Sequence, residues 1–158
     1  IYSAFPRTSS FIVFIDAGLY SQIIQKIPIV CVDVVLRVDG GGYFLVQRAS
    51  EPLKNEWWVV GGRKHLGEGL KEAANRILRQ EIGDVASFIE IEERPVGVYL
   101  DAFEKSSFSS HLYETVSLLV VGYINRKDLN SIAIDKSILG WKVAPDLPTR
   151  LNNKSFWL

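Results

Sequence analysis

Apolar and polar residues follow one another in blocks that predict strands on both sides of one long helix. Residues 29–38 are rich in β-branched side chains, and the glycines at 40–42 separate them from a second apolar run at 43–48. Consecutive glycines supply the positive φ angles of a tight turn, so the two runs predict a β-hairpin. Further short apolar runs predict strands at 57–60, 88–92, 96–100, 115–124 and around Trp141.

The clearest helical signal lies in the middle of the chain, over residues 69–82. Apolar residues recur there at the three- and four-residue spacing of one buried helix face, and Gly83 follows as a C-terminal cap. A shorter helix is predicted over residues 17–26, with Asp16 as its N-cap, and one or two helical turns over 146–151. Strands around one strong helix indicate a layered α/β (α+β) domain.

Length, composition and charge narrow the class of protein. With 158 residues, 47% of them hydrophobic, the chain can bury a core of its own. Residues 1–15 are expected to be irregular, and residues 16–158 to form a single domain. The formal charge is zero and no apolar run could span a bilayer, so neither a nucleic-acid nor a membrane partner is expected. The single cysteine, Cys31, predicts a small buried core residue and a reducing, cytoplasmic compartment.

Glu81 is the most informative charged residue of the central helix. It lies four residues after Ile77 and three after Leu78, so it points toward the buried face. A carboxylate on such a face is costly unless it is paired or bound to a cation. The alternative, equally open from the spacing alone, is that Glu81 lies at the edge of the face and is solvated.

The spacing around this helix forms a longer pattern that begins in a glycine loop. Its fixed positions, separated by five, seven, four and one residues, are Gly62, Glu68, Arg76, Glu81 and Gly83. The pattern resembles the Nudix box, the signature of hydrolases that act on nucleoside diphosphates linked to another group. The resemblance implies an α/β/α sandwich with a mixed central sheet and one catalytic loop–helix. It also implies that Gly62, Glu68 and Arg76 are structural, with Glu68 and Arg76 fixing the loop against the helix.

Two positions depart from the usual box. Ile77 and Gln80 stand where Nudix enzymes carry glutamates that, with the one matching Glu81, hold two or more magnesium ions. Isoleucine cannot bind Mg²⁺, so a multi-metal site for attack on phosphorus is expected to be disabled. One branch of the family, the GDP-mannose mannosyl hydrolases, shows the same loss. In that branch water displaces the nucleoside diphosphate from the sugar C1, with the help of one metal and a histidine base.

Other residues also resemble that branch and take their expected roles from it. Asp33 matches a substrate-contacting aspartate, and Arg48 and Arg63 match two arginines that bind the diphosphate and assist its departure. Arginine suits this task because its guanidinium binds phosphate bidentately and stays charged. The ligands expected for Mg²⁺, or for Mn²⁺ in its place, are Gly61, Glu81 and Asp135. The resemblance further implies a homodimer that acts on a small-molecule nucleotide sugar.

The catalytic histidine of the branch has no counterpart at its usual position. Lys136 stands there, and lysine is a poor base unless burial lowers its pKa. His111 ends a serine-rich loop that could bring it to the site, and Asp101 and Glu114 are alternatives in the same region.

Three functions follow as hypotheses. The leading one is a Mg²⁺-dependent hydrolase of a nucleotide sugar, of the GDP-mannose or GDP-glucose type, that cleaves at the sugar C1. The first alternative is a Nudix pyrophosphohydrolase that cuts between phosphates with Glu81 and Asp135. The second is a catalytically weak domain that binds a nucleotide sugar, which the lysine at position 136 favours.

Overall fold

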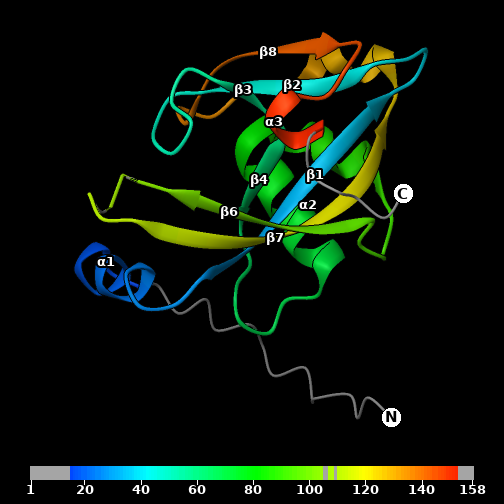
Figure 1. Cartoon of the computed structure of the whole chain (residues 1–158). Coiled ribbons are helices and arrows are strands. Elements are labelled where there is room, and N and C mark those ends of the chain that lie inside the picture. The colour runs from blue at the N-terminus through cyan, green and yellow to red at the C-terminus, as the bar shows by residue number, and fades with distance from the viewer. Residues whose placement is uncertain (1–14, 105–106, 109, 153–158) are drawn as a thin grey trace.

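The computed structural model describes residues 15–104, 107–108 and 110–152. Its strands are β1 (Ile29–Val38), β2 (Tyr43–Arg48), β3 (Trp57–Trp58), β4 (Val60–Arg63), β5 (Glu90–Ile91), β6 (Gly97–Phe103), β7 (Tyr113–Ile124) and β8 (Ile138–Ala144). Its helices are α1 (Ala17–Ile24), α2 (Leu70–Ile82) and α3 (Thr149–Asn152), with 3₁₀ helices η1 (Gly83–Phe88) and η2 (Arg126–Ser131). Over these described residues the strands form one eight-stranded mixed sheet (Figure 1), which confirms the predicted α/β class.

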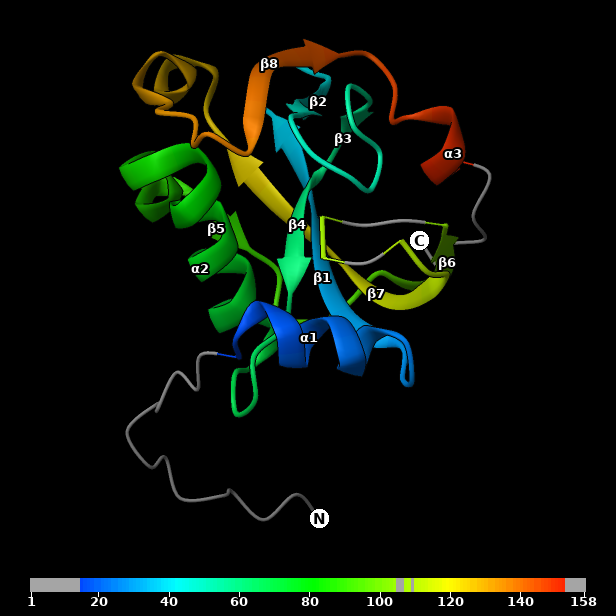
Figure 2. The same cartoon turned by 90° about the vertical axis from the view of Figure 1, so that its left-hand side faces the viewer.

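Strand β1 lies at the centre of the sheet, and its side chains point alternately to the two faces. It pairs in parallel with β7 along its whole length, and antiparallel with β2 and β4 along its other edge. Successive side chains of a strand point to opposite faces. Val32 and Val34 therefore pack in one core with residues of α2, while Asp33 and Val35 face away from that helix. Figure 2 shows α2 beside β1 and β4 on one side of the sheet, with α3 on the other.

Helix α2 buries one face against the sheet, as its apolar spacing predicts. The buried residues of this face are Ala73, Ala74, Ile77, Leu78 and Ile82. Each large apolar side chain contributes about 1.5–3 kcal/mol when fully buried, so this face holds the helix in place. The helix ends at Gly83, whose φ of 80° is one that glycine adopts without strain.

The sequence-based elements differ from the structure at three places. The single strand predicted over 57–60 is split, because β3 pairs with β2 whereas β4 pairs with β1 and extends through Arg63. The strand predicted over 88–92 is reduced to β5, since η1 occupies the residues after Gly83. The helix η2, which had no clear apolar period, was not predicted.

The two ends of the chain agree only in part with their predicted structure. The irregular segment predicted over residues 1–15 lies outside the described residues, except for its last position. Helix α3 covers residues 149–152, within and just beyond the turns predicted over 146–151. Within the described part of the chain, no helix is both long enough and apolar enough to cross a membrane.

Candidate functional site

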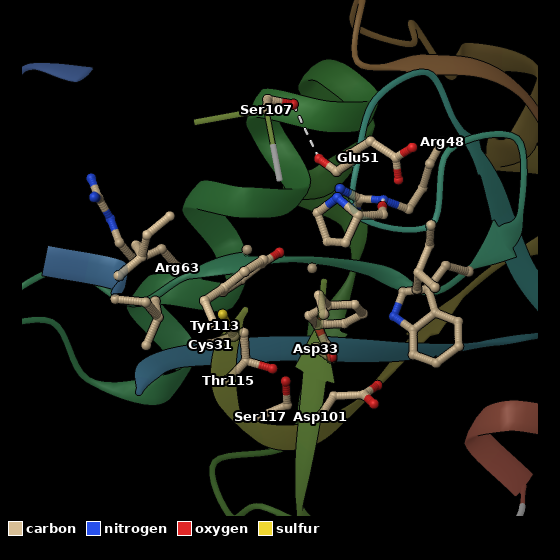
Figure 3. A pocket seen from close by; sticks show the side chains of 18 of the residues that line it. Cys31, Asp33, Arg48, Glu51, Arg63, Asp101, Ser107, Tyr113, Thr115 and Ser117 are labelled. Atoms are coloured by element: carbon tan, nitrogen blue, oxygen red, sulfur yellow. Dashed lines mark hydrogen bonds between the residues drawn. The ribbon is translucent and has the colours of Figure 1, made fainter. Parts of the chain in front are cut away.

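A cavity of about 330 Å³ lies on the face of the sheet that points away from α2 (Figure 3). Its charged and hydroxyl-bearing lining residues are Tyr20, Asp33, Arg48, Ser50, Glu51, Arg63, Tyr99, Asp101, Ser107, Tyr113, Thr115 and Ser117. The rest of the lining is formed by Gly61 and Gly62 together with mainly apolar side chains from α1, β1, β3, β6, the segment between β2 and β3 and the connection between β6 and β7. The strand pairing brings these segments together, because β1 lies between β4 on one edge and β7 on the other.

Asp33 lies at the floor of this pocket, in the middle of β1. The Tyr99 hydroxyl donates a short hydrogen bond to its Oδ2 atom, and Ser117 forms a second side-chain hydrogen bond with it. Burial raises the pKa of Asp33 above its ordinary value, against the opposing effect of these two hydrogen bonds and of the charge of Arg48. The carboxyl group is therefore held in a fixed position within a protected part of the pocket.

Glycine at position 61 is required by the position of Asp33. The two residues face each other in the pairing of β1 with β4, and a Cβ atom at position 61 would lie 1.9 Å from Asp33 Oδ1. We therefore expect Gly61→Ala to push Asp33 off its partners and to destabilise the fold by about 1–3 kcal/mol, as overpacking does. Urea unfolding measures this change. Gly140→Ala is the control, since nothing lies within 4 Å of its added Cβ, and an equal loss in both variants would contradict the account.

Both predicted arginines line the pocket. Arg48 is the last residue of β2 and donates from Nε to the Pro52 carbonyl at 2.7 Å. Arg63 ends β4, and its guanidinium carbon lies 4.6 Å from the centre of the Tyr20 ring. Figure 3 shows the two arginines on opposite sides of the pocket, with Tyr113 and Asp33 between them. A pocket with two guanidinium groups at its sides suits an anionic ligand.

The predicted loop–helix contact is present in the structure. Arg76 donates to the Glu68 carboxylate from Nε at 2.5 Å and from Nη2 at 2.8 Å, and Nη2 also donates to the Arg63 carbonyl at 2.9 Å. The backbone N–H of His65 donates to the same carboxylate at 2.8 Å. These contacts tie the loop between β4 and α2 to the helix and fix the backbone of Arg63.

The contact between Glu68 and Arg76 should make the folded protein less stable in acid. Its hydrogen bonds with Arg76, aided by the His65 amide, hold the pKa of the Glu68 carboxyl at about 2, below its ordinary value of 4.5. Because the folded-state pKa is the lower one, the carboxylate stabilises the fold above about pH 4.5, and this stabilisation disappears as the pH falls toward 2. We expect urea unfolding to show Glu68→Gln less stable than the wild type by about 1.5–3 kcal/mol at pH 7. The two proteins should converge toward pH 2, and a gap that does not change with pH would contradict this prediction.

Glu81 and Asp135 are brought together at the end of α2. The Asp135 N–H donates to the Glu81 carbonyl at 3.0 Å, and the Ser137 N–H donates to Asp135 Oδ1 at 2.9 Å. Burial raises the pKa of Glu81 to about 8; the charge of Arg48 opposes this rise, and the charges of Asp33 and Asp135 add to it. Glu81 has no hydrogen-bonding or ion-pair partner for its side chain within the described residues. A bound cation would favour the ionised form of this side chain.

The described residues at this end of α2 offer few ligands for a metal ion. Ile77 is only 2% exposed and lies against Gly62, so the helix face beside the glycines is apolar. Gln80 is exposed and accepts a hydrogen bond from Arg76. Across residues 15–104, 107–108 and 110–152, no group of three or more His, Cys, Asp or Glu side chains could hold a metal. Magnesium is commonly bound by one or two carboxylates with water and substrate phosphates, and Glu81, Asp135 and the carbonyl of Gly61 could supply such a partial set.

Of the four residues considered as the general base, one lines the pocket and three lie outside it. Asp101 is buried, lines the pocket and accepts a hydrogen bond from Arg150 Nη2 at 2.7 Å. His111, Glu114 and Lys136 are exposed and are not part of the pocket lining. The structure therefore brings a carboxylate, rather than a histidine or a lysine, to the cavity.

Cys31 differs from its prediction as a buried core residue. It is half-buried and lines the pocket, because it lies two residues before Asp33 on the same face of β1. Burial raises the pKa of its thiol to about 12, with the charge of Asp33 adding to the effect, so the thiol is protonated at neutral pH.

Several pocket residues were not found by the sequence analysis. Tyr99 on β6, and Tyr113, Thr115 and Ser117 on β7, were not predicted, whereas Asp101 on β6 was named as an alternative base. All five alternate with exposed or half-buried residues along their strands. The period of two was visible in the sequence, but only the pairing of Asp101 with Thr115 and of Tyr99 with Ser117 shows that both sets share the face of Asp33. Tyr20 reaches the pocket from α1, which no spacing predicts.

A family model described as the NUDIX domain matches residues 28–141. The chain belongs to the NUDIX domain family. The matched range begins just before β1 and ends within β8, so it includes the loop–helix and both pocket arginines. Nudix hydrolases as a family act on nucleoside diphosphate derivatives and generally use divalent metal ions.

Individual relatives match in part. The Low-salt glycan biosynthesis protein Agl8 of Haloferax volcanii is 38% identical over 64 residues, which are 40% of this chain and 40% of Agl8, so the match spans less than half of either protein. The NUDIX domain of Shewanella oneidensis NrtR, solved in complex with ADP ribose, is 21% identical, with a TM-score of 0.56 over 76% of this chain and 74% of that one. A bifunctional NMN adenylyltransferase/ADP ribose pyrophosphatase from Francisella tularensis, solved with AMP and a manganese ion, is 19% identical, with a TM-score of 0.54 over 85% of this chain and 41% of that one. At these identities the two solved structures show a shared fold.

Proposed function

We propose that this Nudix domain is a Mg²⁺-dependent hydrolase of a nucleotide sugar, of the GDP-mannose type, that cleaves at the sugar C1. The observation that carries the proposal is the buried Ile77, which packs against Gly62 where the family's box has a metal-binding glutamate. A site with so few metal ligands is poorly suited to generating hydroxide for attack on phosphorus. The pocket instead offers two arginines, which suit the departure of a diphosphate.

The reaction assigns separate tasks to the residues that line the pocket and to Glu81 and Asp135, which lie outside its lining. A water oxygen bonds to C1 as the bond from C1 to the diphosphate oxygen breaks, and the electron pair of that bond leaves with the nucleoside diphosphate. Arg48 and Arg63 bind the diphosphate, whose negative charge grows as it departs. A bound Mg²⁺, held by Glu81, Asp135 and the Gly61 carbonyl, would neutralise part of the same charge. The water proton passes to a base on the pocket wall.

Two relatives are consistent with a ligand of this kind. The NrtR domain was solved with ADP ribose, which is a nucleoside diphosphate joined to a sugar. Agl8 is named for glycan biosynthesis, a process that consumes activated sugars. Both support a diphosphate-linked sugar as the class of ligand, and neither specifies the nucleoside.

Asp101 is the base that the geometry favours, because it lines the pocket whereas His111, Glu114 and Lys136 do not. General-base help contributes about 10²- to 10⁴-fold, so Asp101→Asn should lower the turnover number by a factor in that range. His111→Gln and Lys136→Gln should each leave the rate within about twofold of the wild type. Steady-state kinetics with GDP-mannose measures all three. A large fall in the turnover number of His111→Gln or Lys136→Gln, with no fall in Asp101→Asn, would show that the histidine or the lysine is the base instead.

A second candidate function is a nucleotide-sugar-binding domain with little turnover. It is favoured by the absence of any histidine from the pocket lining among the described residues and by the incomplete set of metal ligands there. Under this alternative Arg48, Arg63 and Asp33 would bind the ligand without turning it over.

Product analysis distinguishes these functions. The chain is incubated with Mg²⁺ and a panel of GDP-, ADP- and UDP-sugars, with an EDTA arm, and ³¹P NMR follows the phosphates. The proposal predicts a nucleoside diphosphate and free sugar in the presence of the metal. A nucleoside monophosphate with a sugar 1-phosphate would support the pyrophosphohydrolase instead. Saturable binding with no product would support the binding domain.

A further inference from the structure

Tyr20 connects helix α1 to the pocket. Its side chain is partly buried, packs on the cluster formed by Ile24, Ile29 and Tyr113, and lines the cavity. The Arg63 guanidinium lies over its ring, with the guanidinium carbon 4.6 Å from the ring centre. An arginine at this distance from a ring face is attracted by the negative charge of the π-system.

Arg63 is therefore held by contacts at both its backbone and its guanidinium group. At its backbone, the Arg63 carbonyl accepts a hydrogen bond from Arg76 Nη2, which is itself bonded to Glu68. At its far end, the guanidinium rests on Tyr20. A flexible arginine held at both ends loses less side-chain freedom when it binds an anion, and this preorganisation adds to affinity.

Tyr20 is in turn held by a third segment. The Phe108 ring, from the connection between β6 and β7, meets the Tyr20 ring edge-on, with centroids 5.0 Å apart and an interplanar angle of 88°. Ser107, next to it, donates to the Glu51 carbonyl at 3.1 Å. The ring beneath Arg63 is therefore packed on two sides, by the α1 cluster and by Phe108, and its position is fixed before any ligand binds.

We propose that Tyr20 is a positioning residue that holds the Arg63 guanidinium where a diphosphate binds. The inference rests on the proposed function, in which Arg63 contacts the diphosphate. It assigns to α1 a part in ligand binding: this helix supplies the aromatic support for a cation that β4 supplies. The ring is the required feature, so phenylalanine should replace tyrosine at this position and an aliphatic residue should not.

A double-mutant cycle on GDP binding tests the proposal without requiring turnover. Calorimetry in Mg²⁺ measures GDP dissociation constants for the wild type, Tyr20→Leu, Tyr20→Phe, Arg63→Gln and the Tyr20→Leu, Arg63→Gln double variant. Since a cation–π contact is worth roughly 0.5–2 kcal/mol, Tyr20→Leu should weaken GDP binding about two- to thirtyfold. Tyr20→Phe should stay within about twofold. In the Arg63→Gln background, Tyr20→Leu should have no further effect, because its action passes through the arginine.

A matched control and a ligand-free measurement separate positioning from general packing. Tyr123→Leu removes an exposed tyrosine that does not line this pocket and should leave GDP affinity unchanged. In ¹⁵N NMR of the free protein, the Arg63 Nε–H signal should carry a ring-current shift that Tyr20→Leu removes and Tyr20→Phe keeps. Thermal unfolding of each variant reports any general loss of stability.

The outcomes are separable from those of the proposed function. Additive losses in the cycle, or a loss in Tyr20→Phe equal to that in Tyr20→Leu, would overturn the positioning role while leaving the hydrolase proposal standing. Coupled losses in GDP binding together with no hydrolysis of any nucleotide sugar would support the positioning role and overturn the hydrolase. A wild type that binds no GDP would overturn both.

Discussion

Glu81→Gln should abolish Mg²⁺-dependent turnover while leaving the fold intact. Glu81 is the single carboxylate in the second half of α2, since Ile77 and Gln80 occupy the neighbouring positions of the box. Glutamine keeps the shape of the side chain but removes its charge, and a neutral amide is a much weaker ligand for a hard cation than a carboxylate. We expect the turnover number to fall by about a thousandfold or more, in the range found when a group that stabilises developing charge is removed.

The fold should tolerate this change because the half-buried Glu81 carboxyl group has no hydrogen-bonding or ion-pair partner among the described side chains, and its pKa is raised to about 8. An amide of the same shape breaks no ion pair or side-chain hydrogen bond there, so the melting temperature should stay close to that of the wild type. Glu72→Gln, on the exposed face of the same helix, is the control and should retain activity. Full activity in Glu81→Gln would exclude a metal at this end of α2.

Arg63→Gln should lower kcat and raise KM for a nucleotide sugar. A charge-assisted hydrogen bond is worth about 1.5–3 kcal/mol, which corresponds to roughly ten- to a hundredfold in rate. The loss should appear in kcat because the charge on the diphosphate is larger in the transition state than in the bound substrate. Arg48→Gln should show a similar loss, with an added cost in stability because Arg48 also donates to the Pro52 carbonyl.

The matched control for the arginines is Arg79→Gln, on the exposed face of α2. It removes one positive charge from the same molecule and should change the rate less than twofold. If Arg63→Gln changed KM alone, the guanidinium would bind the ground state without assisting departure of the diphosphate. If Arg79→Gln matched Arg63→Gln, the effect would come from the overall charge and not from the pocket.

Much of the fold could be predicted because its signals are local. The ten-residue strand β1, the glycine turn after it and the apolar stripe of α2 are all patterns within a single segment. The division between β3 and β4 could not be predicted, because Val59 lies between two strands that pair with different partners. That choice depends on contacts distant in sequence.

Some residues of the candidate site could be predicted from the sequence, and others could not. Arg48, Arg63 and Asp33 could be selected from the box and its surroundings, and all three line the cavity. Tyr99 and Ser117 could not, because their role comes from the pairing of β6 with β7 and of β7 with β1. Residues far from the box in sequence, such as Tyr20, reach the pocket only through the packing of α1.

The most direct test of the account is the identity of the bond that breaks. GDP-mannose is hydrolysed in ¹⁸O-enriched water with Mg²⁺, and the products are separated and weighed by mass spectrometry. Attack at C1, which the buried Ile77 and the two pocket arginines favour, predicts that the label enters the free sugar and that GDP carries none. Label in a phosphate, with GMP and mannose 1-phosphate as products, would contradict the account.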